Sequence, residues 1–401
     1  MKNIYILAWS HQFNAVQAPA ELIAEGLKQI GHKVTIVNIS TDDGKSSIIR
    51  MLSEKVDLVI GMNPHSFLYT INGELIHKVI NSRFAIMFLD NPIYSKNVWS
   101  LLFENDFPVD SLLLCVDAKQ TEQFKEICIK LYDNRFIAEF FPWGGHQYIG
   151  KQLWGSDKSF DICLFSTLDQ QISTNFMLND DFQGEFSKDV CESSGVLYEE
   201  FSEKVSALIH SNYSQDIVEF ICEQLHVNYY ELTAEALNLV TEVDSFLKRY
   251  RRLAATKALL ETSIQRSYEV AIFGTGWEKL GQLPDNIKIF GPTLYEKQFE
   301  IFNSSKSVLN TDPNWTAGVH DRVFNAFGSG CVAITNQNKY TDFNFTNGYD
   351  CCIYENTNQL EKEIVFAVDN HTDISYRAHR MLTVNHTWKD RCRIITNHLD
   401  Y

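Results

Sequence analysis

The sequence predicts an α/β protein made of two Rossmann-like, doubly wound domains that face a cleft, with a helical insertion in the second domain. Short, almost continuously apolar runs alternate with segments of helical length over residues 1–150. The same alternation resumes after residue 268, beyond a long polar stretch with helical spacing. Such runs are typical of parallel strands that helices bury on both faces. A chain of 401 residues is long enough for two or three domains.

The first domain, residues 1–150, begins with the strand KNIYILAWS. A helix follows in PAELIAEGLKQIG, where Pro19 suits the first turn and Gly31 suits the stop. Further strands are expected in HKVTIVNIS, VDLVIGMN, RFAIMFLDN and SLLLCVD. The stretch FIAEFFPWGGHQY, residues 136–148, breaks this alternation at Pro142. We interpret it as a linker between the domains.

The second domain is expected over residues 151–385, with the helical insertion at about 170–268. It opens with the strand SFDICLFSTL. Beyond the insertion, strands are predicted in YEVAIFGTGW, IKIFG, KSVLNTD and CVAITN, and helices in YEKQFEIFNSS, RVFNAFGSG and NQLEKEIVFAVDN. The strand KSVLNTD is expected to end near Asp312. Residues 386–401 are expected to form a closing C-terminal helix.

Composition limits the class of protein. No apolar run approaches the roughly 20 residues that a membrane span needs, and the first residues lack the pattern of a signal peptide. Nine cysteines are scattered without a CxxC pair, which indicates reduced thiols and no metal site. We therefore expect a cytoplasmic protein with at most peripheral membrane contact. The net charge of −16 argues against nucleic acid as a partner. The basic run Lys248–Arg252 is interpreted as a solvated helix face in preference to a phosphate contact.

The stretch HDRVFNAFGSGCVAIT, residues 320–335, opens a predicted helix with polar side chains. The start of a helix exposes unpaired N–H groups that attract anions. Arg322 adds a fork of donors suited to phosphate oxygens, and Gly318 permits close approach to the backbone. Three residues after Arg322, Asn325 can pair with ribose hydroxyls. The stretch fits a holder of a nucleotide diphosphate, but an ordinary helix start capped by Asp321, with Arg322 in solvent, fits equally well.

A glycine loop follows another predicted strand of the second domain. In IFGTGW, Gly274 and Gly276 could cradle a phosphate. Lys279 stands where the dinucleotide fingerprint has its last glycine, so an oxidoreductase that uses a dinucleotide is only weakly indicated.

The first domain offers two candidate catalytic residues at strand ends. Asp90, in FLDNP, directly follows an apolar strand and could act as a general base. A turn aspartate that hydrogen-bonds its own backbone before Pro92 is an equally common arrangement. His11 follows the first strand and is the second candidate, although a histidine in such a place is more often structural.

The order of these parts resembles the two-domain GT-B glycosyltransferases, and among them the group 1, spore-maturation-type branch. The resemblance is carried by FDICLFST, VAIFGTGW, IKIFGPTLYEKQFEIFNSSKSVLN, HDRVFNAFGSGCVAIT and RAHRMLTVNHTWKDRCRIIT. FLDNP is similar to the strand-end Asp-x-Pro of that branch, and to the segment with the catalytic aspartate in the inverting phage DNA β-glucosyltransferases. The resemblance implies a metal-independent hexosyltransferase of polysaccharide biosynthesis that needs no cofactor. Its donor would be a nucleotide sugar, and we expect a UDP-sugar.

The resemblance also implies roles for particular residues. The donor site would be lined by Ser166, Gly274, Gly276, Gly318, His320, Arg322 and Asn325. Arg322 would hold the donor's pyrophosphate, with Ser166 near the phosphates. Asn325 stands where the family usually has a glutamate that binds the nucleotide ribose. Asp90 would take the proton of the acceptor hydroxyl, with His11 as the other catalytic candidate.

The chain departs from the family pattern at two positions. Retaining members often carry two glutamates eight positions apart, where this chain has Ala317 and Asn325. Loss of both carboxylates favours an inverting mechanism. The acceptor is expected to be a hydroxyl of a surface glycan, a lipid-linked glycan or a protein. The missing glutamates also support an alternative, a non-catalytic nucleotide- or sugar-binding module.

Overall fold

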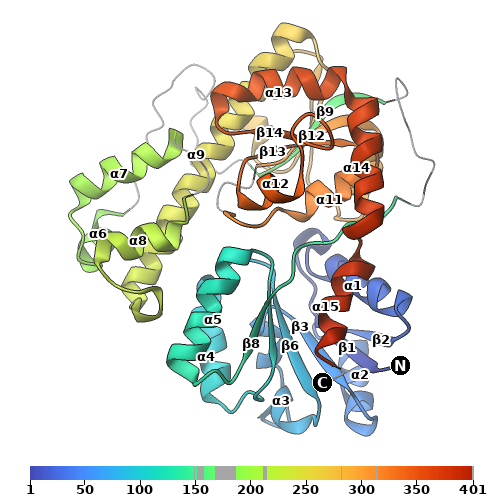
Figure 1. The fold of residues 1–401 in the computed structure, drawn as a ribbon, viewed down its shortest axis with the longest axis vertical. Helices are drawn as coiled ribbons and strands as arrows, with labels where there is room; N and C mark the ends of the chain where they lie inside the picture. Colours follow the sequence, from blue (N-terminus) through green and yellow to red (C-terminus); the bar gives the residue numbers. More distant parts are fainter. Residues whose placement is uncertain are drawn as a thin grey trace. The chain divides into compact units, whose positions relative to one another are not determined.

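Two parallel six-stranded sheets organise the chain in the computed structural model (Figure 1). The structure describes residues 1–148, 150, 158–167, 187–210, 215–280, 282–311 and 315–399. The chain divides into two compact units, residues 1–146 with 385–401, and residues 147–384. The fold class predicted from the sequence, two doubly wound α/β domains, is thereby confirmed. The expected strand end at Asp312 and the part of the insertion before residue 187 lie outside the described residues.

The sheet of the first unit has the strand order β2-β1-β3-β6-β7-β8, and every pairing in it is parallel. Its strands are β1 Asn3–Ala8, β2 Lys33–Asn38, β3 Leu58–Met62, β6 Arg83–Phe88, β7 Leu112–Cys115 and β8 Ile137–Phe140. Its helices are α1 Gln17–Gln29, α2 Asp42–Ser53, α3 Ile76–Val79, α4 Lys96–Glu104 and α5 Ala118–Tyr132, and a short hairpin joins β4 Thr70–Ile71 to β5 Glu74–Leu75. The winding direction reverses between β1 and β3, which makes the carboxyl ends of these strands a usual place for a ligand.

The interpretation of residues 136–148 as a linker was wrong in part. Ile137–Phe140 is the edge strand β8, which pairs with β7 before the chain leaves the sheet at Pro142. The run is only four residues long, so it carries too little of a periodic pattern to distinguish a strand from a loop.

The first unit also includes the end of the chain. Helix α15, Trp388–Asn397, packs on α1, and Cys392 Sγ contacts the Ile23 carbonyl at 3.4 Å. Trp388 lies against two glycines, because a Cβ at Gly26 or at Gly144 would come within 3 Å of its atoms. The C-terminal helix is therefore a packed part of the first unit.

The sheet of the second unit has the order β11-β10-β9-β12-β13-β14, again with parallel pairings. Its strands are β9 Phe160–Phe165, β10 Val270–Phe273, β11 Ile287–Phe290, β12 Ser305–Leu309, β13 Val332–Asn336 and β14 Cys352–Tyr354. Its helices after the insertion are α10 Lys297–Asn303, α11 Asp321–Gly328, α12 Lys339–Asn344, α13 Thr357–Asp369 and α14 His371–Asn385. Here the winding reverses between β9 and β12.

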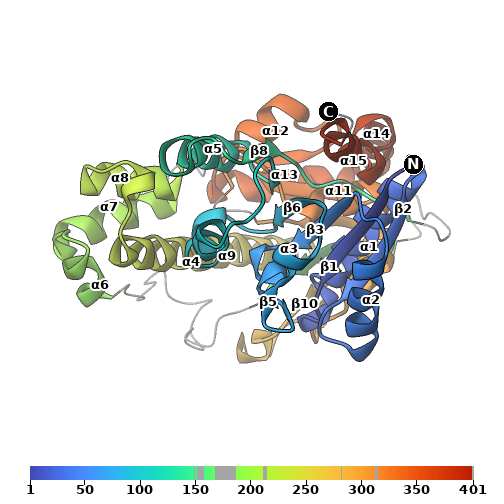
Figure 2. The same ribbon diagram turned by 90° about the horizontal axis from the view of Figure 1, so that it is seen from below.

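The helical insertion consists of α6 Lys188–Ser193, α7 Tyr198–His210, α8 Ile217–Leu225 and the long α9 Ala234–Arg266. Helices α6 to α8 gather at one end of α9, as Figure 2 shows, while its last turns join the core of the second sheet through residues such as Leu259 and Leu260. The interpretation of Lys248–Arg252 as a solvated face was wrong for Arg251. That side chain is 1% exposed, and it donates to the Leu208 carbonyl at 2.7 Å. No helix in the described ranges is long and apolar enough to cross a membrane.

Candidate functional site

The carboxyl edge of the second sheet brings together most of the predicted donor residues. Ser166 directly follows β9, and Gly274 and Gly276 follow β10. Gly318 and His320 lie between β12 and α11, and Arg322 is in the first turn of α11. Strand β9 pairs with both β10 and β12, so these loops leave neighbouring strands at the point where the winding reverses. This is the edge at which open α/β sheets bind ligands.

The glycine loop is fixed against the end of β9. The backbone of Gly274 has φ +143°, and a Cβ there would lie 1.8 Å from the Ser166 carbonyl oxygen, so only glycine fits. The same oxygen accepts a hydrogen bond from Trp277 Nε1 at 2.7 Å, and Ser166 N donates to the Phe273 carbonyl at 3.0 Å. Gly276 also has a positive φ, of +89°. The Ser166 hydroxyl is buried and has no hydrogen-bond partner among the described residues, which leaves it able to serve a ligand.

Helix α11 begins with the polar residues that the sequence singled out. His320 is its N-cap, and Asp321, in the first turn, is 2% exposed. Arg322 is half-buried, and its guanidinium makes no hydrogen bond or ion pair with the part of the chain that the structure describes. A guanidinium without a hydrogen-bond partner at the start of a helix is an arrangement suited to an anion.

Asp321 is a buried carboxylate with three polar neighbours. Its Oδ1 lies in contact with His320 Nδ1, and the carboxylate accepts one hydrogen bond from Tyr295 and another from Asn325 Nδ2 at 3.2 Å. Burial acts to raise the pKa of Asp321, but His320, Tyr295 and the Arg322 guanidinium outweigh it and lower that pKa to about 2. Asp321 therefore stays ionised in the interior. The predicted alternative, a helix start capped by Asp321, is wrong, because the N-cap is His320 and Asp321 lies in the first turn.

Asn325 lies one turn further along α11 and is fully buried. Its amide nitrogen donates to Tyr295 Oη at 2.9 Å and to Asp321. Its side-chain oxygen, Oδ1, is buried and accepts no hydrogen bond from the described residues. One polar atom of Asn325 is thus used internally, and the other could still accept a bond from a ligand.

The loop before α11 is held by a residue that the sequence analysis did not single out. Asn338 is 1% exposed, and its amide donates to the carbonyls of Trp315 and Gly318 at 2.9 and 2.8 Å. The Trp315 ring stacks on that of His320, with centroids 5.7 Å apart and planes 21° apart. Asn338 sits just after a buried strand and before a helix, a position that could have signalled its role.

The candidate residues of the first unit lie at the carboxyl edge of its sheet, but they are exposed. Asp90 follows β6, and its carboxylate makes no hydrogen bond or ion pair within the described ranges. The turn around it is held by neighbours, because Asn91 Oδ1 accepts from Ile93 N at 3.0 Å and Trp99 Nε1 donates to the Pro92 carbonyl at 2.8 Å. Asp90 thus does not cap its own turn; Asn91 does.

His11 follows β1 and is also exposed. Strand β3 lies between β1 and β6, so the two strand ends stand two spacings apart, roughly 10 Å. Between them lies Asn63, whose side chain accepts from Leu89 N at 2.9 Å, followed by the exposed His65. The sequence analysis missed both, although Asn-Pro after an apolar strand occurs here as it does after Asp90.

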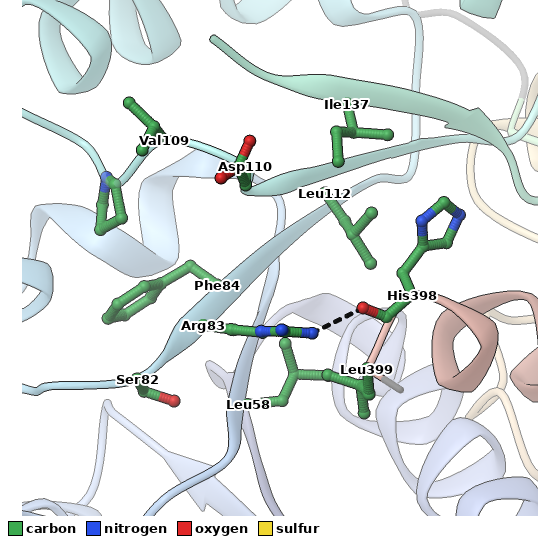
Figure 3. A pocket seen from close by; sticks show the side chains of 11 residues that line it. Leu58, Ser82, Arg83, Phe84, Val109, Asp110, Leu112, Ile137, His398 and Leu399 are labelled. Atoms are coloured by element: carbon green, nitrogen blue, oxygen red, sulfur yellow. Dashed lines mark hydrogen bonds between the residues drawn. The ribbon is translucent and has the colours of Figure 1, made fainter. Parts of the chain in front are cut away.

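One cavity lies away from all of these residues. It has a volume of about 350 Å³ and is formed at the amino ends of β3, β6, β7 and β8 and by the end of α15 (Figure 3). Arg83 borders it and donates to the His398 carbonyl at 2.6 Å. Because ligands of such sheets bind at the opposite edge, this cavity is not part of the candidate site.

No group of three or more His, Cys, Asp and Glu side chains in the described ranges is arranged to hold a metal ion. The nine cysteines are buried free thiols.

Comparisons with known proteins agree with this architecture. Residues 249–397 match a family described as glycosyl transferase-like, and this range contains the glycine loop, α11 and α15. No curated protein matches the sequence significantly.

Several solved structures share the fold across nearly the whole chain. The β-glucosyltransferase of phage T4 with its UDP-glucose substrate has a TM-score of 0.55 and 12% identity, with 100% of both chains covered. Anabaena Alr3699/HepE in complex with UDP-glucose has a TM-score of 0.52 and 9% identity, again with 100% of both chains covered. The sucrose-phosphate synthase of Thermosynechococcus elongatus has a TM-score of 0.51 and 8% identity, and 99% and 98% of the two chains are covered. The chain therefore has the GT-B fold.

Proposed function

We propose that this protein is a glycosyltransferase that moves a sugar from a nucleotide-sugar donor to a hydroxyl acceptor. The observation that carries the proposal is the half-buried Arg322, without a partner among the described residues, at the start of α11 and at the winding reversal of the second sheet. Two buried side-chain oxygens, Oγ of Ser166 after β9 and Oδ1 of Asn325 in α11, also have no hydrogen-bond partner among the described residues. Support also comes from the glycosyl transferase-like match and from similar structures that hold UDP-glucose.

In the proposed reaction, Arg322 and the positive end of the α11 dipole bind the donor's diphosphate. They stabilise the negative charge that grows as the bond between the sugar and the diphosphate breaks. The acceptor hydroxyl attacks the anomeric carbon from the opposite side and passes its proton to Asp90, so the configuration inverts. These groups provide positive charge without a bound metal ion. We take UDP as the nucleotide and a glycan, a lipid-linked glycan or a protein as the acceptor. The net charge of −16 argues against DNA.

The test is binding and turnover of a panel of nucleotide sugars. The wild-type protein should bind UDP and release it slowly from one UDP-sugar by hydrolysis. Arg322→Ala should lower that turnover roughly a hundredfold because the charge on the leaving group loses its main partner. Arg322→Lys should fall between the two, since lysine keeps the charge but loses the fork of donors.

Arg266→Ala is the matched control, because Arg266 is an exposed arginine at the end of α9 in the same unit. It should leave binding and turnover unchanged. Wild-type turnover in Arg322→Ala would contradict the proposal.

A non-catalytic nucleotide-binding module is the second candidate, favoured by the absence of carboxylates at Ala317 and Asn325. A module of that kind would bind UDP with the same dependence on Arg322 but would never release UDP from a donor, with or without acceptors. The same panel therefore separates the two functions.

A further inference from the structure

The cavity at the amino edge of the first sheet is built from one unit alone. Its walls are the first residues of β3, β6, β7 and β8, the loop before β7 and the end of α15 (Figure 3). All of these elements belong to the first unit. At roughly 30 Å³ for each water-sized group, a volume of about 350 Å³ has room for about a dozen ligand atoms other than hydrogen. The cavity is therefore large enough for a small organic molecule.

Most of the cavity wall is apolar. It includes the side chains of Leu58, Phe84, Leu112, Ile137 and Leu399. All of them except the half-buried Ile137 are buried residues of the first unit. An apolar ligand surface that covers this wall leaves water together with it, which favours binding. A sugar or a nucleotide, with polar groups over most of its surface, does not match such a wall.

The wall carries one cationic group, the guanidinium of Arg83 at the start of β6. Its Nη1 donates to the His398 carbonyl at 2.6 Å, and it makes no other hydrogen bond and no ion pair with the residues that the structure describes. Most of its N–H donors therefore remain available to a ligand. Because these donors form a planar fork, they match the two oxygens of a carboxylate.

Two further polar side chains border the cavity. The hydroxyl of Ser82, the residue before Arg83, is buried and has no hydrogen-bond partner among the described residues. A buried hydroxyl of this kind costs free energy, and a ligand oxygen beside Arg83 could supply the missing partner. Asp110 is an exposed carboxylate on the loop before β7, and its charge disfavours a second negative group on a ligand. The polar groups thus fit a single carboxylate and not a phosphate.

The cavity also connects the sheet to the end of the chain's last helix. His398 and Leu399 border it, and their carbonyl oxygens accept from Arg83 and from Lys2 Nζ, the latter at 3.2 Å. A molecule that fills the cavity would contact both β6 and the residues that follow α15. Since such a molecule binds only the folded unit, it should hold the end of α15 in place.

We propose that this cavity binds a monocarboxylic acid with an apolar body, about ten atoms other than hydrogen in all. The carboxylate pairs with Arg83, and the apolar body lies against the buried side chains of the wall. The bound acid stabilises the packing of α15 on the first unit. This site lies at the edge of the sheet opposite Asp90, and it does not depend on the proposed function.

The test is calorimetric titration of the full-length protein with octanoate, octan-1-ol and octylammonium, which have the same chain length. The wild-type protein should bind octanoate at one site, at least about tenfold more tightly than the other two, because only the carboxylate pairs with a guanidinium. Arg83→Leu should weaken octanoate binding about tenfold and leave octan-1-ol unaffected, so the preference for the acid disappears. Val109→Trp places a large ring at the 56% exposed Val109 on the wall and should weaken binding of octanoate without a change in the core.

Arg50→Leu is the matched control. Arg50 is an exposed arginine on α2 of the same unit, and it pairs with Glu54 at 3.6 Å, so the change removes the same charged group away from the cavity. It should leave the affinity for octanoate unchanged. Arg83→Lys keeps a cation at position 83 and should keep a preference for octanoate, which makes the test decisive if Arg83→Leu folds poorly.

Hydrogen exchange gives a second measurement. Octanoate should slow exchange of the last amides of α15 in the wild-type protein but not in Val109→Trp. If octanoate binds the wild-type protein no more tightly than octan-1-ol does, or not at all, the proposal is overturned. Wild-type affinity for octanoate in Val109→Trp or in Arg83→Leu would place the acid elsewhere on the protein and would overturn it as well.

Discussion

The carboxyl edges of the two sheets are built in different ways. In the second unit the polar side chains are interior groups, with Asp321 at 2% and Asn325 at 0% exposure, and they hold one another in place. In the first unit Asp90 and His11 are exposed, and the structure fixes the backbone beside Asp90 rather than its carboxylate. Changing the interior side chains of the second unit should lower its stability, whereas the exposed side chains of the first unit can change without such a cost. The edge of the second unit fits a binding site for one constant ligand, and the edge of the first unit fits a site for a variable partner.

The largest expected effect is on the second edge, at Gly274. Gly274→Ala forces a Cβ into the Ser166 carbonyl and strains a φ of +143°, so it should lower the free energy of unfolding by about 3 kcal/mol. Gly73→Ala, in the hairpin turn of the first unit, has a φ of +87° but open space around it and should cost only about 1 kcal/mol. Urea unfolding checks both values. Equal costs would contradict the steric role assigned to the Ser166 carbonyl at Gly274.

The next largest effect is a loss of stability of the first unit as the pH falls. His386 is buried, and burial, together with the Arg391 guanidinium that donates to it at 2.7 Å, lowers its pKa to about 4. Since the unfolded chain takes up this proton nearer pH 6.5, stability is full above that pH and is lost as pH falls towards 4, by about 3 kcal/mol. Hydrogen exchange in α15 should therefore quicken over this range, after correction for intrinsic rates.

His386→Asn provides the control for that prediction. The amide oxygen of asparagine can accept from Arg391 as the imidazole does, but it does not take up a proton. The variant should show a flat response between pH 6.5 and 4. If exchange in α15 of the variant still quickens as in the wild type, groups other than His386 cause the pH dependence.

The second unit should lose stability at a lower pH than the first unit does, and the loss should be smaller. The folded pKa of Asp321 is about 2, below the ordinary value of 3.8, so its stabilising contribution is present above about pH 4 and is lost as pH falls towards 2. The expected loss is about 2 kcal/mol, seen as faster exchange of the α11 amides. Asp321→Asn should abolish this acid dependence. If the α11 amides begin to exchange faster at a higher pH than the α15 amides do, this order of acid sensitivity is wrong.

The smallest effect on stability is expected at Asp90. Asp90→Asn removes an exposed carboxylate that holds nothing in the described structure, so the free energy of unfolding should stay within about 0.5 kcal/mol. Turnover of the donor with an acceptor should nevertheless fall by at least about a hundredfold, while UDP affinity stays constant. Asp110→Asn, an exposed carboxylate at the amino edge of the same sheet, is the control that should leave turnover unchanged. Full activity of Asp90→Asn would exclude it as the base.

The sequence predicted the architecture well because buried parallel strands are local, nearly continuous apolar runs. The prediction failed at β8, because a strand of four residues is too short to show a periodic pattern. It also failed at Arg251, because its burial depends on a hydrogen bond to the Leu208 carbonyl, which is distant in the sequence. Arg322 could be found from its place at the start of a predicted helix, and Ser166 from the resemblance of its segment to the family. Tyr295 could not, because its role depends on how the loop before α10 meets α11.

The packing of α15 has a consequence for the order in which the protein can be made. Residues 385–401 leave the ribosome after all of the second unit, yet Trp388 and Cys392 fill space against α1 in the first. During synthesis, Gly26 and Ile23 of the first unit therefore stay uncovered until α15 has been made, while the second unit does not need α15. A chain truncated before residue 385 would therefore lack the last helix of the first unit but no residue of the second.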